Sequence, residues 1–313
     1  MTTLIADSGS TKTTWCLVDA AKGQPAVIQP VQTQGLNPLY ASADEIAAAA
    51  RTVVEATGER TPDLVQFYGA GCSGDRVDKV ETALRRVFTP FTRIEVASDL
   101  LGACRALYGH VQSRNHYGND GRSRNNGSSF ADGNRNQPES GKGIACILGT
   151  GAIAARYDYQ TDEMQTASSL GYILGDEGSG AWLGRNVLSD YLKEQMPSRV
   201  RALFEQDFGA ISAESAIQHV YQNPFPNRYL ASFATFVGSH SDVSYCQQLA
   251  FCGIELFFRR NVMRLKPSSG EPISFVGSVA YHLRDTIAQV CAINDLTLGT
   301  ILKEPMQGLV ERR

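Results

Sequence analysis

The residues best suited to chemistry lie in the polar loop Asp7-Ser8-Gly9-Ser10-Thr11-Lys12, which separates two apolar segments. Glycine lets backbone amides approach a phosphate closely, and Ser, Thr and Lys add hydroxyl and cationic donors. A carboxylate at a strand end can hold Mg²⁺, directly or through water. An ordinary hairpin turn with a polar tip explains the same residues, so the loop alone leaves both interpretations open. It is not a Walker A loop, because the string G-x-x-x-x-G-K-[ST] does not occur in the sequence.

Two further glycine-containing loops follow later in the chain. Gly149-Thr150-Gly151 begins a match to the dinucleotide-binding pattern G-x-G-x-x-A. The segment after it reads as a strand rather than a helix, so a second phosphate loop facing the first is the better interpretation. The turn at Gly277-Ser278 joins a predicted strand to a predicted helix. Amides at that helix start could face a nucleotide, although plain packing of helix on strand is the commoner reason for such a turn.

Four polar side chains have both a structural and a functional interpretation. Asp99 lies between a predicted strand and a predicted helix, where it is either an N-cap or a general base that takes a proton from a substrate hydroxyl. Asp176 and Glu177 either cap the helix that follows Ser179 or bind sugar hydroxyls. Asn37, in the string G-L-N-P, is either a turn residue or a hydrogen-bonding group for a ligand.

Length and composition set limits on these interpretations. The chain has 313 residues, which predicts about two domains, and its 42% hydrophobic and 19% charged residues predict a substantial core. A formal charge of −3 gives no general attraction to nucleic acid or to an anionic membrane. No apolar run reaches the roughly 18 residues of a membrane helix, and the first residues do not resemble a signal peptide.

The cysteines and histidines exclude some metal chemistry. The seven cysteines are scattered and contain no C-x-x-C pair, and the five histidines contain no H-E-x-x-H. This pattern indicates reduced thiols in a cytoplasmic protein rather than a zinc or iron–sulfur site.

The pattern of apolar residues predicts the elements that must position these loops. Residues 4–18 read as a strand, a glycine loop and a second strand, and Ser42 with Glu45 forms a capping box at the start of a helix. The first 108 residues read as three strands followed by helix, strand, helix, strand and helix. Strands alternating with helices predict an α/β sheet that is covered on its faces.

The second half of the chain repeats part of this organisation. Residues 110–142 are rich in Asn, Ser and Gly and predict a mobile insertion. Strands predicted at 144–148 and 153–159 flank the G-T-G loop, as in the hairpin at 4–18, which suggests a duplicated architecture. Residues 198–265 read as helical with a break at 223–226, residues 273–276 as a strand and residues 279–291 as a helix.

Seven segments in this order resemble the actin-like ATPase and sugar-kinase superfamily, and most closely the N-acetylglucosamine kinase branch grouped with the BadF/BadG/BcrA/BcrD ATPases. The segments are D-S-G-S-T-K-T-T-W (7–15), G-L-N-P (35–38), G-A-G-C-S-G (69–74), S-D-L-L-G-A (98–103), I-L-G-T-G (147–151), L-G-Y-I-L-G-D-E-G-S-G (170–180) and F-V-G-S-V-A (275–280). The G-D-E-G-S-G run is the most discriminating of them. One residue departs from the pattern, because Ala152 stands where relatives often have Ser.

The resemblance implies an α/β fold of two ribonuclease-H-like domains with a cleft between them. The first domain is expected at 1–108, completed by 304–313, and the flexible insertion at 109–142. The second is expected at 143–303, with a helical insertion at 198–265.

The resemblance also implies a role for each candidate residue. Asp7 would organise Mg²⁺, and Gly9, Ser10, Thr11 and Lys12 would contact the β- and γ-phosphates. Gly149, Thr150 and Gly151 would form the second phosphate loop, and Gly277 and Ser278 would line the adenosine pocket. Asp99 would be the base. The sugar hydroxyls would be bound by Asn37, Asp99, Thr150, Gly151 and Asp176.

The implied function is ATP-dependent phosphorylation of an amino sugar, most closely N-acetylglucosamine at its 6-hydroxyl, with ATP and Mg²⁺ as cofactors. Two alternatives stay open: an ATPase that activates acyl-CoA dehydratases or reductases, and a non-catalytic sensor of sugars or peptidoglycan fragments. The expected partners are the sugar and ATP, with no nucleic acid and no membrane. The oligomeric state stays open, with a homodimer among the alternatives.

Overall fold

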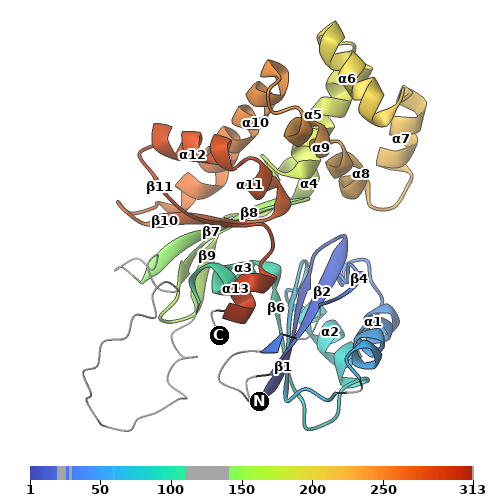
Figure 1. Cartoon of the computed structure of the whole chain (residues 1–313), viewed down its shortest axis with the longest axis vertical. Coiled ribbons are helices and arrows are strands. Elements are labelled where there is room, and N and C mark those ends of the chain that lie inside the picture. Colours follow the sequence, from blue (N-terminus) through green and yellow to red (C-terminus); the bar gives the residue numbers. More distant parts are fainter. Residues whose placement is uncertain (20–25, 28–29, 59, 110–140, 312–313) are drawn as a thin grey trace.

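The computed structural model describes residues 1–19, 26–27, 30–58, 60–109 and 141–311. Two mixed β-sheets organise it, with helices on their faces (Figure 1). The insertion predicted at 110–142 falls almost wholly outside the described residues.

The strands are β1 (Thr2–Ser8), β2 (Lys12–Asp19), β3 (Ala26–Val27), β4 (Val31–Gln34), β5 (Leu64–Gly69), β6 (Arg93–Ser98), β7 (Lys142–Leu148), β8 (Ala152–Asp158), β9 (Glu163–Thr166), β10 (Pro272–Val276) and β11 (Thr297–Leu302). The helices are α1 (Ala43–Ala56), α2 (Asp75–Arg85), α3 (Asp99–Tyr108), α4 (Gly171–Leu174), α5 (Gly180–Leu192), α6 (Ser198–Phe208), α7 (Ala213–Tyr221), α8 (Pro226–Ser232), α9 (Ala234–Ser239), α10 (Ser244–Phe257), α11 (Ser278–His282), α12 (Arg284–Ile293) and α13 (Met306–Glu311). A π-helical turn, η2 (Phe258–Val262), and a 3₁₀ turn, η3 (Met263–Leu265), extend α10.

The two sheets share one strand order. The first runs β3-β2-β1-β5-β6, with β4 also paired to β2, and the second runs β11-β10-β7-β8-β9. In each, the central strand pairs antiparallel with the strand that follows it in the chain and parallel with a later one. The duplicated architecture suggested by the two glycine hairpins is therefore confirmed.

The first sheet is covered on both faces, because alternate residues of a strand point to opposite sides. Leu4 and Ala6 of β1 pack in the core beneath α1 and α2, whereas Ile5 packs with Met306 and Leu309 of α13. Ser42 caps α1 in the predicted capping box, which saves the first turn from unpaired amides.

Helix α3 lies between the two sheets (Figure 1). Its residues Leu100, Cys104 and Leu107 pack in one core with side chains of β7, β8 and β10. The hydroxyl oxygen of Tyr108 lies 2.9 Å from the carbonyl oxygen of Ile144 and 3.0 Å from that of Pro272, so its one proton is shared between these two acceptors. Helix α3 thus joins the two halves of the molecule.

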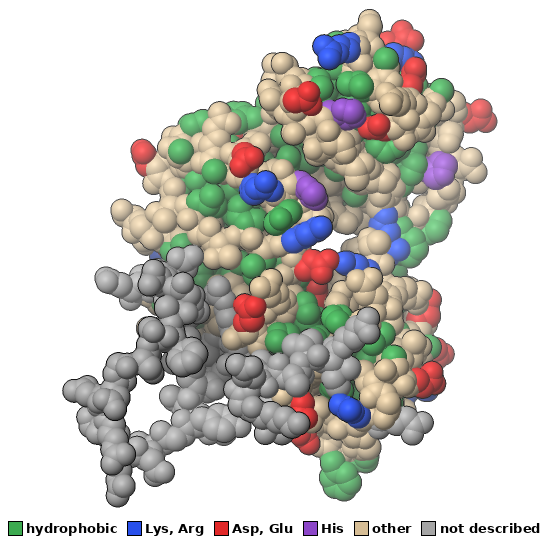
Figure 2. Space-filling model, in the orientation of Figure 1, with side chains coloured by type: hydrophobic (Ala, Val, Ile, Leu, Met, Phe, Trp, Pro, Cys, Tyr) green, Lys and Arg blue, Asp and Glu red, His purple; other side chains and the backbone are tan. Residues whose placement is uncertain are grey.

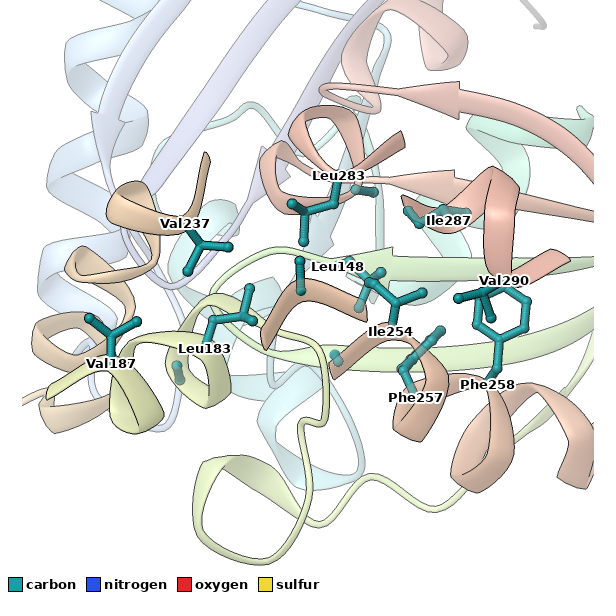
Figure 3. Packing of buried hydrophobic residues seen from close by; sticks show 14 of the residues in the cluster. Leu148, Leu183, Val187, Val237, Ile254, Phe257, Phe258, Leu283, Ile287 and Val290 are labelled. Carbon is teal, nitrogen blue, oxygen red and sulfur yellow. The ribbon is translucent and has the colours of Figure 1, made fainter. Parts of the chain in front are cut away.

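The largest core lies between the second sheet and helices α5, α9, α10 and α12 (Figure 3). Its members include Leu148, Leu183, Val187, Val237, Ile254, Phe257, Phe258, Leu283, Ile287 and Val290. The helical interpretation of 198–265 and its break are confirmed, since α7 ends at Tyr221 and α8 begins at Pro226.

Some sequence predictions were wrong or incomplete. The single helix predicted over 279–291 is two helices, because Leu283 ends α11 and caps α12. Four strands rather than three precede α1. Strands β9 and β11 and helix α13 were not predicted. Within the part of the chain that the structure describes, no helix has the length and apolar character that a bilayer crossing needs.

Candidate active site

Asp7 and Asp99 lie at the carboxyl edge of the first sheet. Strands β1, β5 and β6 run parallel, and their register aligns Asp7 with Tyr68 and Tyr68 with Ala97. Two strand spacings separate Asp7 from the end of β6, which is about 10 Å between Cα atoms. Parallel pairing thus brings together two carboxylates that lie far apart in the sequence.

The loop at 9–12 is a tight turn between β1 and β2. The amide of Gly9 donates to the carbonyl oxygen of Lys12 at 3.0 Å, and the amide of Gly35 donates to that of Thr11 at 3.0 Å. A side chain at position 35 would collide with the carbonyl group of Ser10. Gly35 therefore lets the end of β4 pack directly on the predicted phosphate loop.

An ion pair joins this loop to the second half of the chain. The Nζ atom of Lys12 lies 2.6 Å from Oε1 of Glu304, which follows strand β11. Because both side chains are about half exposed, the pair contributes little to stability. The pair matters for its position, because it links the carboxyl ends of the strands in the first sheet to those in the second. No sequence motif marks Glu304, so sequence reasoning missed it.

The two aspartates have unusual acidity. Burial, followed by the charges of Asp99 and Glu304, raises the pKa of Asp7 to about 7, and Lys12 partly opposes this. Burial likewise raises the pKa of Asp99 to about 6, against a backbone hydrogen bond from Leu100 that lowers it. A carboxylate with a pKa near the working pH is well suited to accept a proton.

Asp99 is not the N-cap of α3. That position belongs to Ser98, whose hydroxyl accepts from the amide of Leu101 at 3.2 Å. Asp99 is the first helical residue, and its Oδ1 accepts from the amide of Leu100 at 2.9 Å. The structural interpretation of Asp99 as a cap is therefore wrong.

Asn37 is a turn residue beside the first site. Its side chain is buried, and its Oδ1 accepts from the amide of Leu39 at 3.0 Å. The glycine at position 71, at φ +79°, leaves room for this amide group, since a side chain there would collide with it. The turn interpretation of Asn37 is confirmed, and the side chain borders the loop after β5.

The G-T-G loop is the hairpin between β7 and β8, so the dinucleotide interpretation is excluded. The carbonyl oxygens of Gly149 and Thr150 accept from the amides of Gly180 and Ala181, at 2.8 and 3.1 Å. These amides begin α5, so the loop is fixed to the start of that helix. A side chain on Gly151 would come within 3.0 Å of Asp176.

Gly277 packs against the start of the G-T-G loop. It has φ +129°, and a side chain there would collide with the carbonyl of Leu148. Its amide donates to the carbonyl oxygen of Leu302 at 3.0 Å. Ser278 is exposed and begins α11. The two glycine loops of the second sheet are therefore neighbours at one edge.

Asp176 and Glu177 do not cap α5, because Ser179 does so through a bond from the amide of Trp182 at 3.2 Å. Asp176, at φ +56°, accepts instead from the amide of Ala152 at 3.2 Å. Burial raises the pKa of Asp176. Glu177 is buried and pairs with Arg260 of η2 at 2.7 Å.

A cavity of about 430 Å³ borders the segment that contains Asp176 and Glu177. Asp176, Glu177 and Arg260 line it together with Thr166 of β9 and Leu174 of α4. The cavity is large enough for a monosaccharide, and its polar wall contains both carboxylates.

The predicted site residues thus form two groups. Asp7, the loop at 9–12, Asn37 and Asp99 lie at the edge of the first sheet, and the G-T-G loop, Asp176 and Gly277-Ser278 lie at the edge of the second. Figure 2 shows basic and acidic side chains at the hollow between the two halves. A second contact joins the groups, because the Nη2 atom of Arg228 on α8 donates to the carbonyl oxygen of Ser10.

The donor set fits a magnesium ion bound together with phosphates. No three His, Cys, Asp or Glu side chains of the described ranges come together as metal ligands. Mg²⁺ usually takes one or two carboxylates and completes its shell with water and substrate phosphates. The partly buried carboxylate of Asp7, with the charges of Asp99 and Glu304 near it, is suited to that role.

Comparisons with known proteins can be set beside this geometry. No family model matches the chain, and no curated protein matches it. The crystal structure of a proposed N-acetylglucosamine kinase from Porphyromonas gingivalis is 39% identical, with a TM-score of 0.81. The match covers 99% of this chain and 97% of that one.

Two more distant structures support the fold alone. One is a proposed N-acetylglucosamine kinase from Chromobacterium violaceum, at 18% identity and a TM-score of 0.67. The other is a ROK family glucokinase from Streptomyces griseus in complex with glucose and AMPPNP, at 16% identity and a TM-score of 0.52. Each match covers 99% of this chain and 97% of the other. The repeated sheet order agrees with these matches. The identity and coverage of the Porphyromonas gingivalis match show that the chain belongs to the family of that protein, the sugar kinases with two ribonuclease-H-like domains of the actin-like ATPase fold around a cleft.

Proposed function

We propose that the chain is an ATP-dependent kinase of an amino sugar, with the 6-hydroxyl of N-acetylglucosamine as the acceptor. The observation that carries the proposal is the position of Asp99. Its carboxylate lies on the same sheet edge as the loop at 9–12, and burial raises its pKa to about 6. A proton acceptor beside a phosphate loop is what transfer of a phosphoryl group to a hydroxyl requires.

In this proposal Asp99 accepts the proton of the sugar 6-hydroxyl. The sugar oxygen attacks the γ-phosphorus in line, and the bond between the γ-phosphorus and ADP breaks. The amides and side chains of Gly9, Ser10, Thr11 and Lys12 bind the β- and γ-phosphates and stabilise the charge that develops on them. Lys12 also holds Glu304 at 2.6 Å, so a nucleotide phosphate competes with that carboxylate for the ammonium group.

Residues of the second sheet supply the other nucleotide contacts, and the sugar contacts come from both sheets. Gly149, Thr150 and Gly151 form the second phosphate loop, and Gly277 and Ser278 line the adenosine site. The sugar hydroxyls are bound by Asn37, Asp99, Thr150, Gly151 and Asp176. The bond from the amide of Ala152 leaves one oxygen of Asp176 for such a hydroxyl.

Asp7 would hold Mg²⁺ together with oxygens of the nucleotide phosphates. The bound ion neutralises phosphate charge. Asp7 would help to fix the phosphates in this way, and it takes no part in the proton transfer.

Further parts of the proposal follow from the resemblance to the actin-like ATPase and sugar-kinase superfamily. The domains are residues 1–108 with 304–313, and 143–303 with the helical insertion at 198–265. The branch is that of the BadF/BadG ATPases, and the location is the cytoplasm. Packing of α13 on Ile5, Cys16 and Tyr68 supports the assignment of 304–313 to the first domain.

The test is release of ADP from Mg-ATP with and without a panel of amino sugars. Asp99→Asn is the variant and Asp242→Asn, at an exposed carboxylate before α10, is the matched control. Release that depends on one sugar, and is lost only in Asp99→Asn, supports the proposal and names the substrate. Near-normal turnover in Asp99→Asn overturns the base assignment. Sugar-independent hydrolysis indicates an activator ATPase instead, and sugar binding without release indicates a sensor.

A further inference from the structure

Arg228 reaches from the helical part of the second half to the loop at 9–12. It lies on α8, which sits above the tips of β2 and β4 in Figure 1. Its Nη2 atom donates to the carbonyl oxygen of Ser10. Position 228 carries no motif, so sequence reasoning gave no sign of this contact.

The guanidinium group is poorly satisfied where it lies. Among the described residues no carboxylate forms an ion pair with it, and its buried Nε atom has no hydrogen-bond partner. One face of the group stacks on the ring of Phe225, with 4.0 Å between Cζ and the ring centroid. Arg228 is only partly buried, but its Nε atom is shielded from water and has no hydrogen-bond partner, which an anion at this position would supply.

The surroundings hold Arg228 in this position. Phe225 has φ +59°, a backbone conformation unusual for an aromatic residue, and Pro226 starts α8 directly after it. The ring of Tyr40, which follows the G-L-N-P segment, contacts the ring of Phe225 edge-on at 5.2 Å between centroids. A strained residue that is held by packing on both sides often marks a functional site.

The same helix is fixed to the second phosphate loop. Helix α8 packs closely on α5, where a side chain at Gly184 would collide with the carbonyl of Leu230. The first amides of α5 in turn donate to the carbonyls of Gly149 and Thr150. Arg228 and the G-T-G loop therefore belong to one packed unit, which faces the loop at 9–12.

We infer that Arg228 is a further catalytic residue, whose guanidinium group contacts the terminal phosphoryl group bound at the loop of residues 9–12. The inference rests on the proposed function, which places the β- and γ-phosphates at that loop. Arginine suits the role because its planar donors match phosphate oxygens, and only one of its N–H groups is used by Ser10. As the phosphoryl group moves to the sugar oxygen, Arg228 stabilises the negative charge on the transferring oxygens.

The experiment compares wild type with Arg228→Met and Arg228→Lys. Arg199→Met, at an exposed arginine of α6, is the matched control. Turnover is measured with the sugar that wild type uses, and dissociation constants are measured for ATP and for ADP. We expect Arg228→Met to lower kcat about 100-fold, as loss of one charge-stabilising donor does elsewhere, and to leave KM for the sugar nearly unchanged.

Two further readouts distinguish a catalytic role of Arg228 from a purely structural role in holding the two halves of the molecule together. Arg228→Met should weaken ATP about tenfold and leave ADP unaffected, since only ATP has the terminal phosphate. Added guanidinium ion should restore part of the lost turnover, which a loss of packing alone would not allow. Equal weakening of ATP and ADP, or a kcat close to that of wild type, overturns the inference.

Failure of this inference can be told apart from failure of the proposed function. If wild type turns over no sugar, the proposed function fails. The comparison of ATP with ADP needs no turnover, so it still decides whether Arg228 senses the terminal phosphate. Should Arg228→Met not fold, Arg228→Lys gives the same comparison, because lysine keeps the charge but loses the fork of donors.

Discussion

Replacing Asp99 with asparagine should stabilise the folded protein at neutral pH while it removes turnover. The reason is that burial raises the pKa of the carboxyl from 3.8 to about 6. A carboxyl with a raised pKa contributes stability that is fully present below about pH 4 and is lost as the pH rises through about 6. Asparagine has no such loss, so the variant gains on wild type as the pH increases.

The size of the effect follows from the difference between the two pKa values. At about 1.36 kcal/mol for each pKa unit, the raised pKa of Asp99 costs about 3 kcal/mol of stability at pH 8 and about 1.6 kcal/mol at pH 5, relative to acid pH. The advantage of Asp99→Asn should therefore grow by about 1.4 kcal/mol between these two pH values. Removal of the Asp99 charge also lowers the pKa of Asp7, which acts in the same direction.

Urea unfolding of wild type and Asp99→Asn at pH 5, 6, 7 and 8 measures this growth. Any difference in packing between Asp and Asn is the same at each pH and cancels. Asp242→Asn, at an exposed position, is the control. A difference in free energy of unfolding that stays flat from pH 5 to pH 8 would refute the claim that burial raises the pKa of Asp99, and with it the argument for this residue as the base.

Three further outcomes are expected from other contacts. Gly277→Ala should lower both Tm and ATP affinity, because Gly277 has φ +129° and an alanine side chain there would collide with the carbonyl of Leu148. A thermal melt and a nucleotide titration check this, and an unchanged Tm contradicts it. Arg156→Met should cost about 3–5 kcal/mol in urea unfolding, since it leaves the buried carboxylate of Glu271, 2.7 Å away, without its partner. Lys12→Gln should change stability by less than about 1 kcal/mol because its ion pair is exposed, yet raise KM for ATP; unchanged steady-state kinetics would argue against a phosphate contact.

Local signals were enough to predict much of the fold. The hairpin at 4–18, the capping box of α1 and the break before Pro226 depend on neighbouring residues, and the structure has all three. Strand β9 was missed because its four residues are all exposed, so it lacks the alternation of a half-buried strand. Helix α13 has six residues and depends on its packing against distant strands.

The candidate site likewise contains features that the sequence predicts and features that it does not. Gly277 is visible in sequence because its backbone conformation requires glycine, and the strand-end carboxylates are visible because each follows a predicted strand. Ser98 and Ser179 are the caps, whereas sequence reasoning considered only their acidic neighbours for that role, and the backbone conformation decides which residue caps. Glu304 and Arg228 approach the first loop through tertiary packing, which no local pattern encodes.

The packing of α13 has a consequence for how the protein is made. Met306, Leu309 and Val310 complete the apolar face formed by Ile5 and Cys16, although almost the whole chain lies between them. A ribosome releases the first strands long before this helix exists, so the nascent first half must wait with one face of its sheet open. Closing so long a loop is entropically expensive and slow. The last step of folding is therefore expected to be the docking of α13, and assembly of the first half cannot finish before synthesis of the second.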